Sequence, residues 1–126
     1  MKKSGDTVKS ILIVEDEKPI SDLCRRVLGS QGIEVGIADN GKAAQDMIKK
    51  ERLFDLLLID IRLPEMNGME LYDWLKEKHP LMANRVIFTT GSVLGQDTLN
   101  FLTKSGRPFL LKPFTADELI AMLGKL

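Results

Sequence analysis

A run of large apolar residues, Leu56 to Ile59, ends abruptly at the carboxylate of Asp60 in the stretch DLLLIDIRLPEMNG. A β-strand buried on both faces has this uninterrupted apolar pattern, because neither of its faces meets water. Asp60 would then lie at the carboxyl edge of the sheet, where open α/β sheets bind their ligands. For this residue taken alone, the structural alternative is an Asp that simply starts a loop.

Short apolar runs alternate with helical patterns along the rest of the chain. The other strands are predicted at residues 10–14, 33–37, 86–89 and 108–111. Helices are predicted at about 19–31, 40–52, 69–78, 96–104 and 116–123, with Asn40 and Thr115 as N-caps and Pro80 ending the third. This alternation indicates a parallel five-stranded sheet with helices on both faces.

Composition limits the classes of function. The 126 residues are 44% hydrophobic and 29% charged, which predicts one globular domain over residues 10–126 after a flexible tail at 1–9. Eighteen basic and eighteen acidic residues cancel, so no basic surface suggests direct binding of nucleic acid. The start MKKSGDTVKS resembles no signal peptide and no run reaches membrane-span length, so we expect a cytoplasmic protein without membrane insertion.

Four conspicuous side chains are predicted to be structural. Cys24 falls in the apolar stripe of a helix, which favours a core residue over a nucleophile. The single histidine, His79, stands before a proline at a helix end, where a solvated cap is expected. Tyr72 and Trp74 share one helix, and one or both should pack on the sheet.

Polar residues follow four of the predicted strands. Glu15 and Asp16 follow the first, Asp60 the third, Thr90 the fourth and Lys112 the fifth. Carboxylates that converge repel one another unless a cation intervenes, and Mg²⁺ favours carboxylate oxygens together with water. Lys112 offers a compact positive charge for a phosphoryl oxygen, and Thr90 a hydroxyl. Together they predict a carboxylate that is phosphorylated in the presence of a metal ion.

Each of these residues alone has a structural alternative. The two acidic residues after the first strand could simply stabilise the N-terminus of the following helix, because their negative charges interact favourably with the helix dipole. Thr90 could be an ordinary hydroxyl at a strand end, and Lys112 a solvated charge. Their joint occurrence, each after a different strand, favours a site.

The motifs ILIVEDE, LLLIDIRLPEMNG, FTTG and LLKPF together resemble the receiver domain of two-component response regulators, over about residues 10–123. The resemblance implies a CheY-like, flavodoxin-like fold, a three-layer sandwich with strand order 2-1-3-4-5. It also implies a signalling domain that phosphorylates and dephosphorylates itself. Such a domain is not an enzyme in the ordinary sense.

The resemblance implies a role for each residue at the carboxyl edge. Asp60 matches the phosphoacceptor, which takes a phosphoryl group from the phosphohistidine of a sensor histidine kinase or a histidine phosphotransfer protein. Asp16, Asp60 and the backbone carbonyl of Arg62 match the Mg²⁺ ligands, with Glu15 acting through water. Thr90 and Lys112 match the residues that contact the phosphoryl group, and the Lys112–Pro113 bond is expected to be cis.

The same resemblance implies how the signal leaves the site. Phe109 matches an aromatic switch position that often holds tyrosine, and it lacks the phenol hydroxyl. The expected output face combines the fourth predicted helix, the fifth strand and the last helix, and it would bind a downstream effector or a second copy of the domain. Its candidate apolar contacts are Leu99, Leu102 and Phe109.

Three alternative functions are disfavoured. A phosphatase of the haloacid-dehalogenase type has the motif D-x-D at its nucleophile, and the second Asp is its general acid. In this chain Arg62 stands at the position of that general acid. A flavodoxin-like flavin carrier needs a phosphate loop after the first strand, where Glu15, Asp16 and Glu17 would repel phosphate. A receiver that acts only as a binding module would not need every phosphorylation residue. The chain could be a stand-alone receiver or part of a hybrid sensor kinase or a multidomain regulator. The C-terminal stretch GSVLGQDTLNFLTKSGRPFLLKPF resembles receivers attached to hybrid sensor kinases, which favours that alternative.

Overall fold

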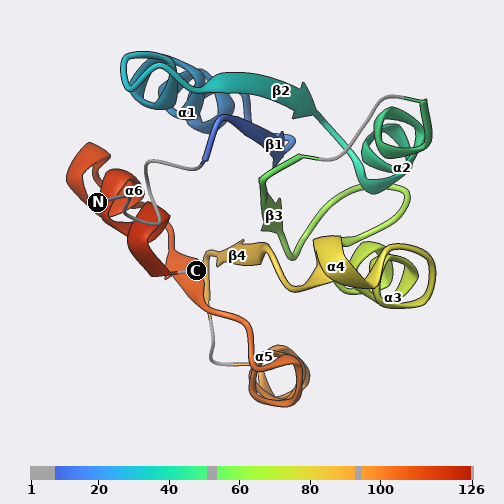
Figure 1. Cartoon of the computed structure of the whole chain (residues 1–126). Coiled ribbons are helices and arrows are strands. Elements are labelled where there is room, and N and C mark those ends of the chain that lie inside the picture. The colour runs from blue at the N-terminus through green and yellow to red at the C-terminus, as the bar shows by residue number, and fades with distance from the viewer. Residues whose placement is uncertain (1–7, 51–53, 93–94, 126) are drawn as a thin grey trace.

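The computed structural model of the chain describes residues 8–50, 54–92 and 95–125. Its sheet has five strands in the order β2-β1-β3-β4-β5, and neighbouring strands run parallel (Figure 1). The strands are β1 (Ser10–Val14), β2 (Glu34–Ala38), β3 (Leu56–Asp60), β4 (Val86–Thr90) and β5 (Phe109–Leu111). The predicted strand order and flavodoxin-like fold are confirmed.

Helices cover both faces of the sheet, so the domain has three layers (Figure 1). One face is covered by α1 (Lys18–Gly29) and α6 (Ala116–Ala121), with a 3₁₀ turn (Met122–Lys125) after α6. The other face is covered by α2 (Gly41–Lys50), α3 (Gly68–Lys78), α4 (Pro80–Ala83) and α5 (Gln96–Ser105).

The central strand β3 is buried along its whole length. Leu57 and Ile59 pack in the core beneath α2 and α3, whereas Leu56 and Leu58 pack in the core beneath α1 and α6. Each such side chain contributes about 1.5–3 kcal/mol when fully buried. Packing on both faces therefore holds the strand that carries Asp60 rigidly in place.

The side chains predicted to be structural do pack as expected. Cys24 is fully buried, and burial raises the pKa of its thiol to about 12, which leaves it unreactive. Tyr72 meets Phe88 of the sheet edge to face, with ring centroids 5.4 Å apart. Trp74 is only partly buried and lies against the ring of His79, 5.0 Å away, at the C-cap of α3.

Helix ends differ from the sequence prediction in two places. Pro80 was expected only to end the third helix, but it also begins the short helix α4, because proline suits a first helical turn. The helix α1 ends at Gly29 and not near Gln31, and Gly32 makes the following turn with φ +78°. The predicted end of α2 at Arg52 lies outside the described residues.

Side-chain caps fix where three helices begin. The expected caps are confirmed: Asn40 Oδ1 accepts from the backbone N–H of Ala43 at 2.7 Å, and Thr115 forms a capping box with Glu118. A further capping box, Asn67 with Glu70, starts α3. Its N-x-x-E signature in the sequence NGME could have predicted it.

Two residues before the first strand already make tertiary contacts. Val8 is buried, and the backbone N–H of Lys9 donates to Asp55 Oδ2 at 2.7 Å. Of the predicted flexible tail, residues 1–7 lie outside the described part of the chain.

Gly68, the first residue of α3, allows the chain to pass close to the end of β3. A Cβ atom there would lie 2.4 Å from the carbonyl oxygen of Asp60 and 2.9 Å from Ile61 Cα. We expect Gly68→Ala to lower the free energy of unfolding by about 1–3 kcal/mol, because the backbone that carries Asp60 must shift. Urea unfolding followed by circular dichroism measures this.

Gly29→Ala is the matched control, because a Cβ atom at Gly29 would meet no atom within 4 Å. It should leave stability unchanged or raise it by up to about 1 kcal/mol, since alanine restricts the unfolded chain. Equal effects of the two substitutions would contradict the close approach at Gly68.

Candidate functional site

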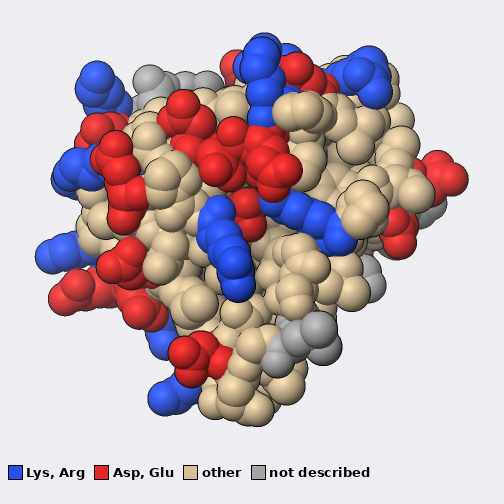
Figure 2. Space-filling model, turned by 180° about the vertical axis from the view of Figure 1, so that it is seen from behind, with Lys and Arg blue, Asp and Glu red and all other residues tan. Residues whose placement is uncertain are grey.

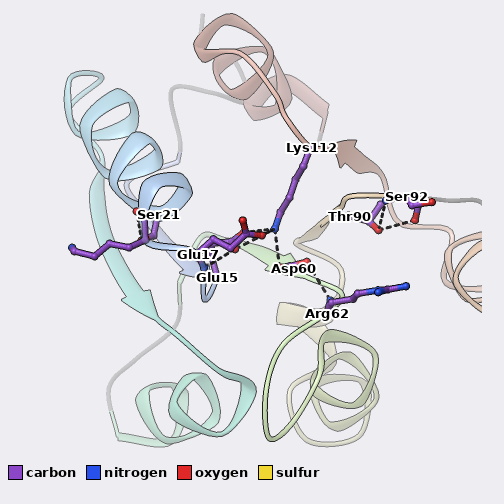
Figure 3. Close-up of polar contacts among 9 residues, drawn as sticks. Glu15, Glu17, Ser21, Asp60, Arg62, Thr90, Ser92 and Lys112 are labelled. Carbon is purple, nitrogen blue, oxygen red and sulfur yellow. Dashed lines mark hydrogen bonds and ion pairs between the residues drawn. The ribbon is translucent and has the colours of Figure 1, made fainter.

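Residues that are distant in the sequence meet at the carboxyl edge of the sheet (Figure 3). Asp60 is the last residue of β3, and Glu15 directly follows β1, which pairs with β3. Lys112 directly follows β5 and reaches across to both carboxylates. The predicted convergence of these groups is therefore present in the fold.

Lys112 is the centre of the polar network. Its Nζ atom lies 2.8 Å from Asp60 Oδ2, 2.9 Å from Glu15 Oε1 and 3.2 Å from Glu17 Oε2. An ammonium group has three N–H donors, and here a different carboxylate can accept from each of them. The bond from Lys112 to Pro113 is cis, as the resemblance to receiver domains implies.

Burial and charge set the proton affinities of these groups. Burial raises the pKa of both Asp60 and Glu15, and the hydrogen bonds from Lys112 oppose this rise. Burial also lowers the pKa of Lys112, but hydrogen bonds to Asp60 and Glu15 outweigh it and raise the pKa above its ordinary value. Lys112 therefore stays charged at neutral pH and stabilises the two buried carboxylates.

The carboxylates form a cluster with an excess of negative charge. Ligand oxygens from four residues lie within 4.8 Å of one another: Glu15, Asp16, Glu17 and Asp60. Figure 2 shows acidic side chains gathered near the middle of one face of the molecule, with basic side chains beside them. One ammonium cannot neutralise four carboxylates, and this donor set of oxygens fits a hard divalent cation such as Mg²⁺.

Glu17 is the member of the cluster that the sequence analysis did not assign to the site. It belongs to the motif EDE, but its reach to Lys112 depends on how the loop after β1 folds. Its backbone N–H donates to Glu15 Oε2 at 3.0 Å, which turns the loop toward the sheet edge.

Arg62 stands two residues after Asp60. Its backbone N–H donates to Asp60 Oδ1 at 3.2 Å, whereas Figure 3 shows its side chain directed away from Lys112. Beside the cluster is an open cavity of about 520 Å³, which gives access from solvent and is lined by Asp16, Ile61, Arg62, Leu63, Pro64, Asn67, Met69 and Thr98.

Thr90, the last residue of β4, lies at the same edge but is bonded to its own loop. Its hydroxyl donates to the carbonyl oxygen of Ser92 at 2.9 Å and accepts from the Ser92 N–H at 3.3 Å. In Figure 3 both residues lie to one side of Asp60. The hydroxyl is thus close in the fold to the acidic cluster without joining the Lys112 network.

The expected output face exposes a different apolar set from the one predicted. Phe109 and Leu99 are 41% and 44% exposed, in agreement with the prediction. Leu102 is only 4% exposed, so its prediction as a surface contact is wrong: it faces inward from α5 and packs in the core with Phe88. Leu111 of β5, which was not predicted, is 50% exposed and takes its place.

Comparison with known proteins assigns the family. A family model described as the response regulator receiver domain matches residues 11–124, so the chain belongs to the receiver domains of two-component response regulators. The transcriptional regulatory protein CrdR of Helicobacter pylori is 36% identical over 115 residues, 91% of this chain and 53% of that protein. The response regulator SaeR of Staphylococcus aureus is 32% identical over 117 residues, 92% of this chain and 49% of that protein. The chain spans about half the length of these curated relatives.

Solved structures agree with this assignment. The CheY-like response regulator receiver domain protein from Methanospirillum hungatei JF-1 matches with a TM-score of 0.83 at 30% identity, covering 94% of this chain and 93% of that one. The receiver domain of a signal transduction histidine kinase from Syntrophus aciditrophicus matches with a TM-score of 0.82 at 27% identity, covering 93% and 88%. In the described part of the present chain, every helix is too short or too polar to cross a bilayer.

The charge of the cluster leads to a prediction for Asp16. We expect Asp16→Asn to weaken Mg²⁺ binding about tenfold or more, because one carboxylate of the acidic cluster is lost. In the absence of metal the same change should raise the melting temperature, since it removes one of several like charges. Calorimetric titration and thermal unfolding measure the two effects.

The control is Asp22→Asn. Asp22 lies on α1 in an exposed pair with Lys18, 3.3 Å away, and such pairs contribute little. Unchanged Mg²⁺ affinity in Asp16→Asn would remove Asp16 from the ligand set.

Proposed function

We propose that this chain is a phosphoacceptor in a cytoplasmic two-component phosphorelay. Asp60 would take a phosphoryl group from the phosphohistidine of a sensor histidine kinase or a histidine phosphotransfer protein. The observation that carries the proposal is the buried Asp60 carboxylate, hydrogen-bonded to Lys112 at 2.8 Å within a cluster of acidic side chains. Membership of the receiver family supports it.

The proposed reaction is a direct displacement at phosphorus. A carboxylate oxygen of Asp60 forms the new P–O bond while the P–N bond to imidazole breaks, and the ring nitrogen keeps the electron pair. Bound Mg²⁺ would neutralise charge on the phosphoryl oxygens, held by Asp16, Asp60 and the carbonyl of Arg62, with Glu15 acting through water. Lys112 would donate to a phosphoryl oxygen, because its ammonium already lies beside the nucleophile.

Signal output would begin at Thr90. Its hydroxyl would leave Ser92 and contact the phosphoryl group, and Phe109 would move inward from its exposed position into the space released. The readout surface would be the face formed by α5, β5 and α6, where Leu99, Phe109 and Leu111 are exposed. A downstream effector or a second copy of the domain would bind there.

Labelling with a small phosphodonor tests the phosphoacceptor. Acetyl phosphate with Mg²⁺ should add one phosphoryl group to the wild-type protein, and Asp60→Asn should abolish the adduct because asparagine is no nucleophile for phosphorus. Intact-mass spectrometry measures both. Asp22→Asn is the control and should be labelled like the wild type. An adduct that persists in Asp60→Asn would refute the assignment.

Amide NMR tests the output path. Adding beryllofluoride, a phosphoryl mimic, with Mg²⁺ should shift the amides of Leu99, Phe109 and Leu111 as well as those near Asp60. The shifts on the output face should persist in Thr90→Ser, which keeps the hydroxyl, and shrink in Thr90→Ala, which lacks it. Changes confined to the neighbourhood of Asp60 in the wild type would show that the two regions are not coupled.

A further inference from the structure

Lys112 has a third carboxylate partner that the proposed reaction does not use. Glu17 Oε2 lies 3.2 Å from Lys112 Nζ, and the Glu17 side chain is 60% exposed. The side chains of the other two partners, Asp60 and Glu15, are 4% and 3% exposed. Among the three carboxylate partners of the ammonium in the described part of the chain, Glu17 is therefore the one in contact with bulk water.

The position of Glu17 in the chain makes this contact unusual. Glu17 is the N-cap of α1, yet its side chain makes no hydrogen bond to the helix. Shorter residues such as Ser or Asp at an N-cap bond to the first turn of their own helix. The longer side chain of Glu17 instead crosses from the loop after β1 to the residue after β5.

A phosphoryl group on Asp60 would require the same ammonium. Each of the three N–H donors of Lys112 can already be matched to a carboxylate. A phosphoryl oxygen on Asp60 can take over the N–H that the Asp60 carboxylate accepted, but a second bond from Lys112 to the phosphoryl group requires that Glu15 or Glu17 be displaced. Releasing Glu15 would leave a buried charge without its partner, which is costly. Releasing the exposed Glu17 costs little, because water solvates its carboxylate.

We propose that Glu17 competes with the phosphoryl group for Lys112: it holds the ammonium in the unphosphorylated protein and releases it when Asp60 is phosphorylated. The inference rests on the proposed function and assigns Glu17 as a positioning residue. Both the competition and the negative charge of Glu17 oppose the arrival of an anionic phosphoryl group. Glu17 thereby slows phosphorylation of Asp60.

Two substitutions separate the reach of Glu17 from its charge. Glu17→Gln keeps the length and removes the charge, whereas Glu17→Asp keeps the charge but is one methylene too short to hold Lys112 in the same way. At Mg²⁺ concentrations that saturate each protein, we expect both variants to be labelled by acetyl phosphate about two- to fivefold faster than the wild type, the range that an exposed ion pair can supply. Asp22→Asn on α1 is the control and should match the wild type.

A readout independent of labelling follows the contact itself. In the wild type, beryllofluoride with Mg²⁺ should shift the side-chain carboxyl ¹³C resonance of Glu17 toward that of a free glutamate, and the resonance of Asp22 should stay constant. A Glu17 resonance that does not move would overturn the inference.

The outcomes of labelling are distinct. Faster labelling of Glu17→Gln alone would mean that only long-range charge acts, and equal rates in all four proteins would mean that Glu17 has no role. Either result overturns the inference and leaves the proposed function intact. A wild-type protein that takes no phosphoryl group at all would overturn the proposed function, and this inference with it.

Discussion

The ion pair between Lys112 and Asp60 is the interaction on which the site depends. It joins the ends of β3 and β5, which are not neighbours in the sheet, with a separation of 2.8 Å between Nζ and Oδ2. Breaking a buried pair of this kind by removing one partner costs about 3–5 kcal/mol, because the remaining charge stays buried. The same ammonium serves Glu15, so one side chain makes two buried carboxylates compatible with the fold.

The fold holds the site together although the site has an excess of negative charge. Four carboxylates surround one ammonium, so the cluster favours any further cation that can reach it. The cluster lies beside the cavity that Asp16 and Arg62 line, and its exposed members are Asp16 and Glu17. This distribution of charge fits a divalent cation and agrees with the proposed phosphorylation in the presence of Mg²⁺.

Rigid and adjustable parts of the site are separated. Asp60 ends a strand packed on both faces, and the start of α3 lies against its carbonyl group. Glu17 instead lies in the exposed loop after β1, and Thr90 ends β4 with its hydroxyl bonded to Ser92 of the following loop, so the polar contacts of both side chains can be exchanged for another ligand. Phe109, the first residue of the three-residue strand β5, is likewise partly exposed to solvent. A fixed carboxylate with movable neighbours is the arrangement that the proposed switch requires.

The sequence by itself determined the order of strands and helices, the burial of β3 and the meeting of Glu15, Asp60 and Lys112. The succession of elements along the chain and the burial of β3 follow from local apolar periodicity, and parallel strands end at one edge of a sheet. The order of strands in the sheet, which brings these three residues together, came from the resemblance of the sequence motifs to receiver domains. It could not place Glu17 on Lys112 or turn Leu102 inward, because both depend on where α1 and α5 sit against the sheet. Nor could it show that the Thr90 hydroxyl bonds to Ser92, since a hydroxyl chooses among several nearby acceptors. Side-chain reach and helix rotation are decided by packing among distant residues, and only the tertiary structure contains that information.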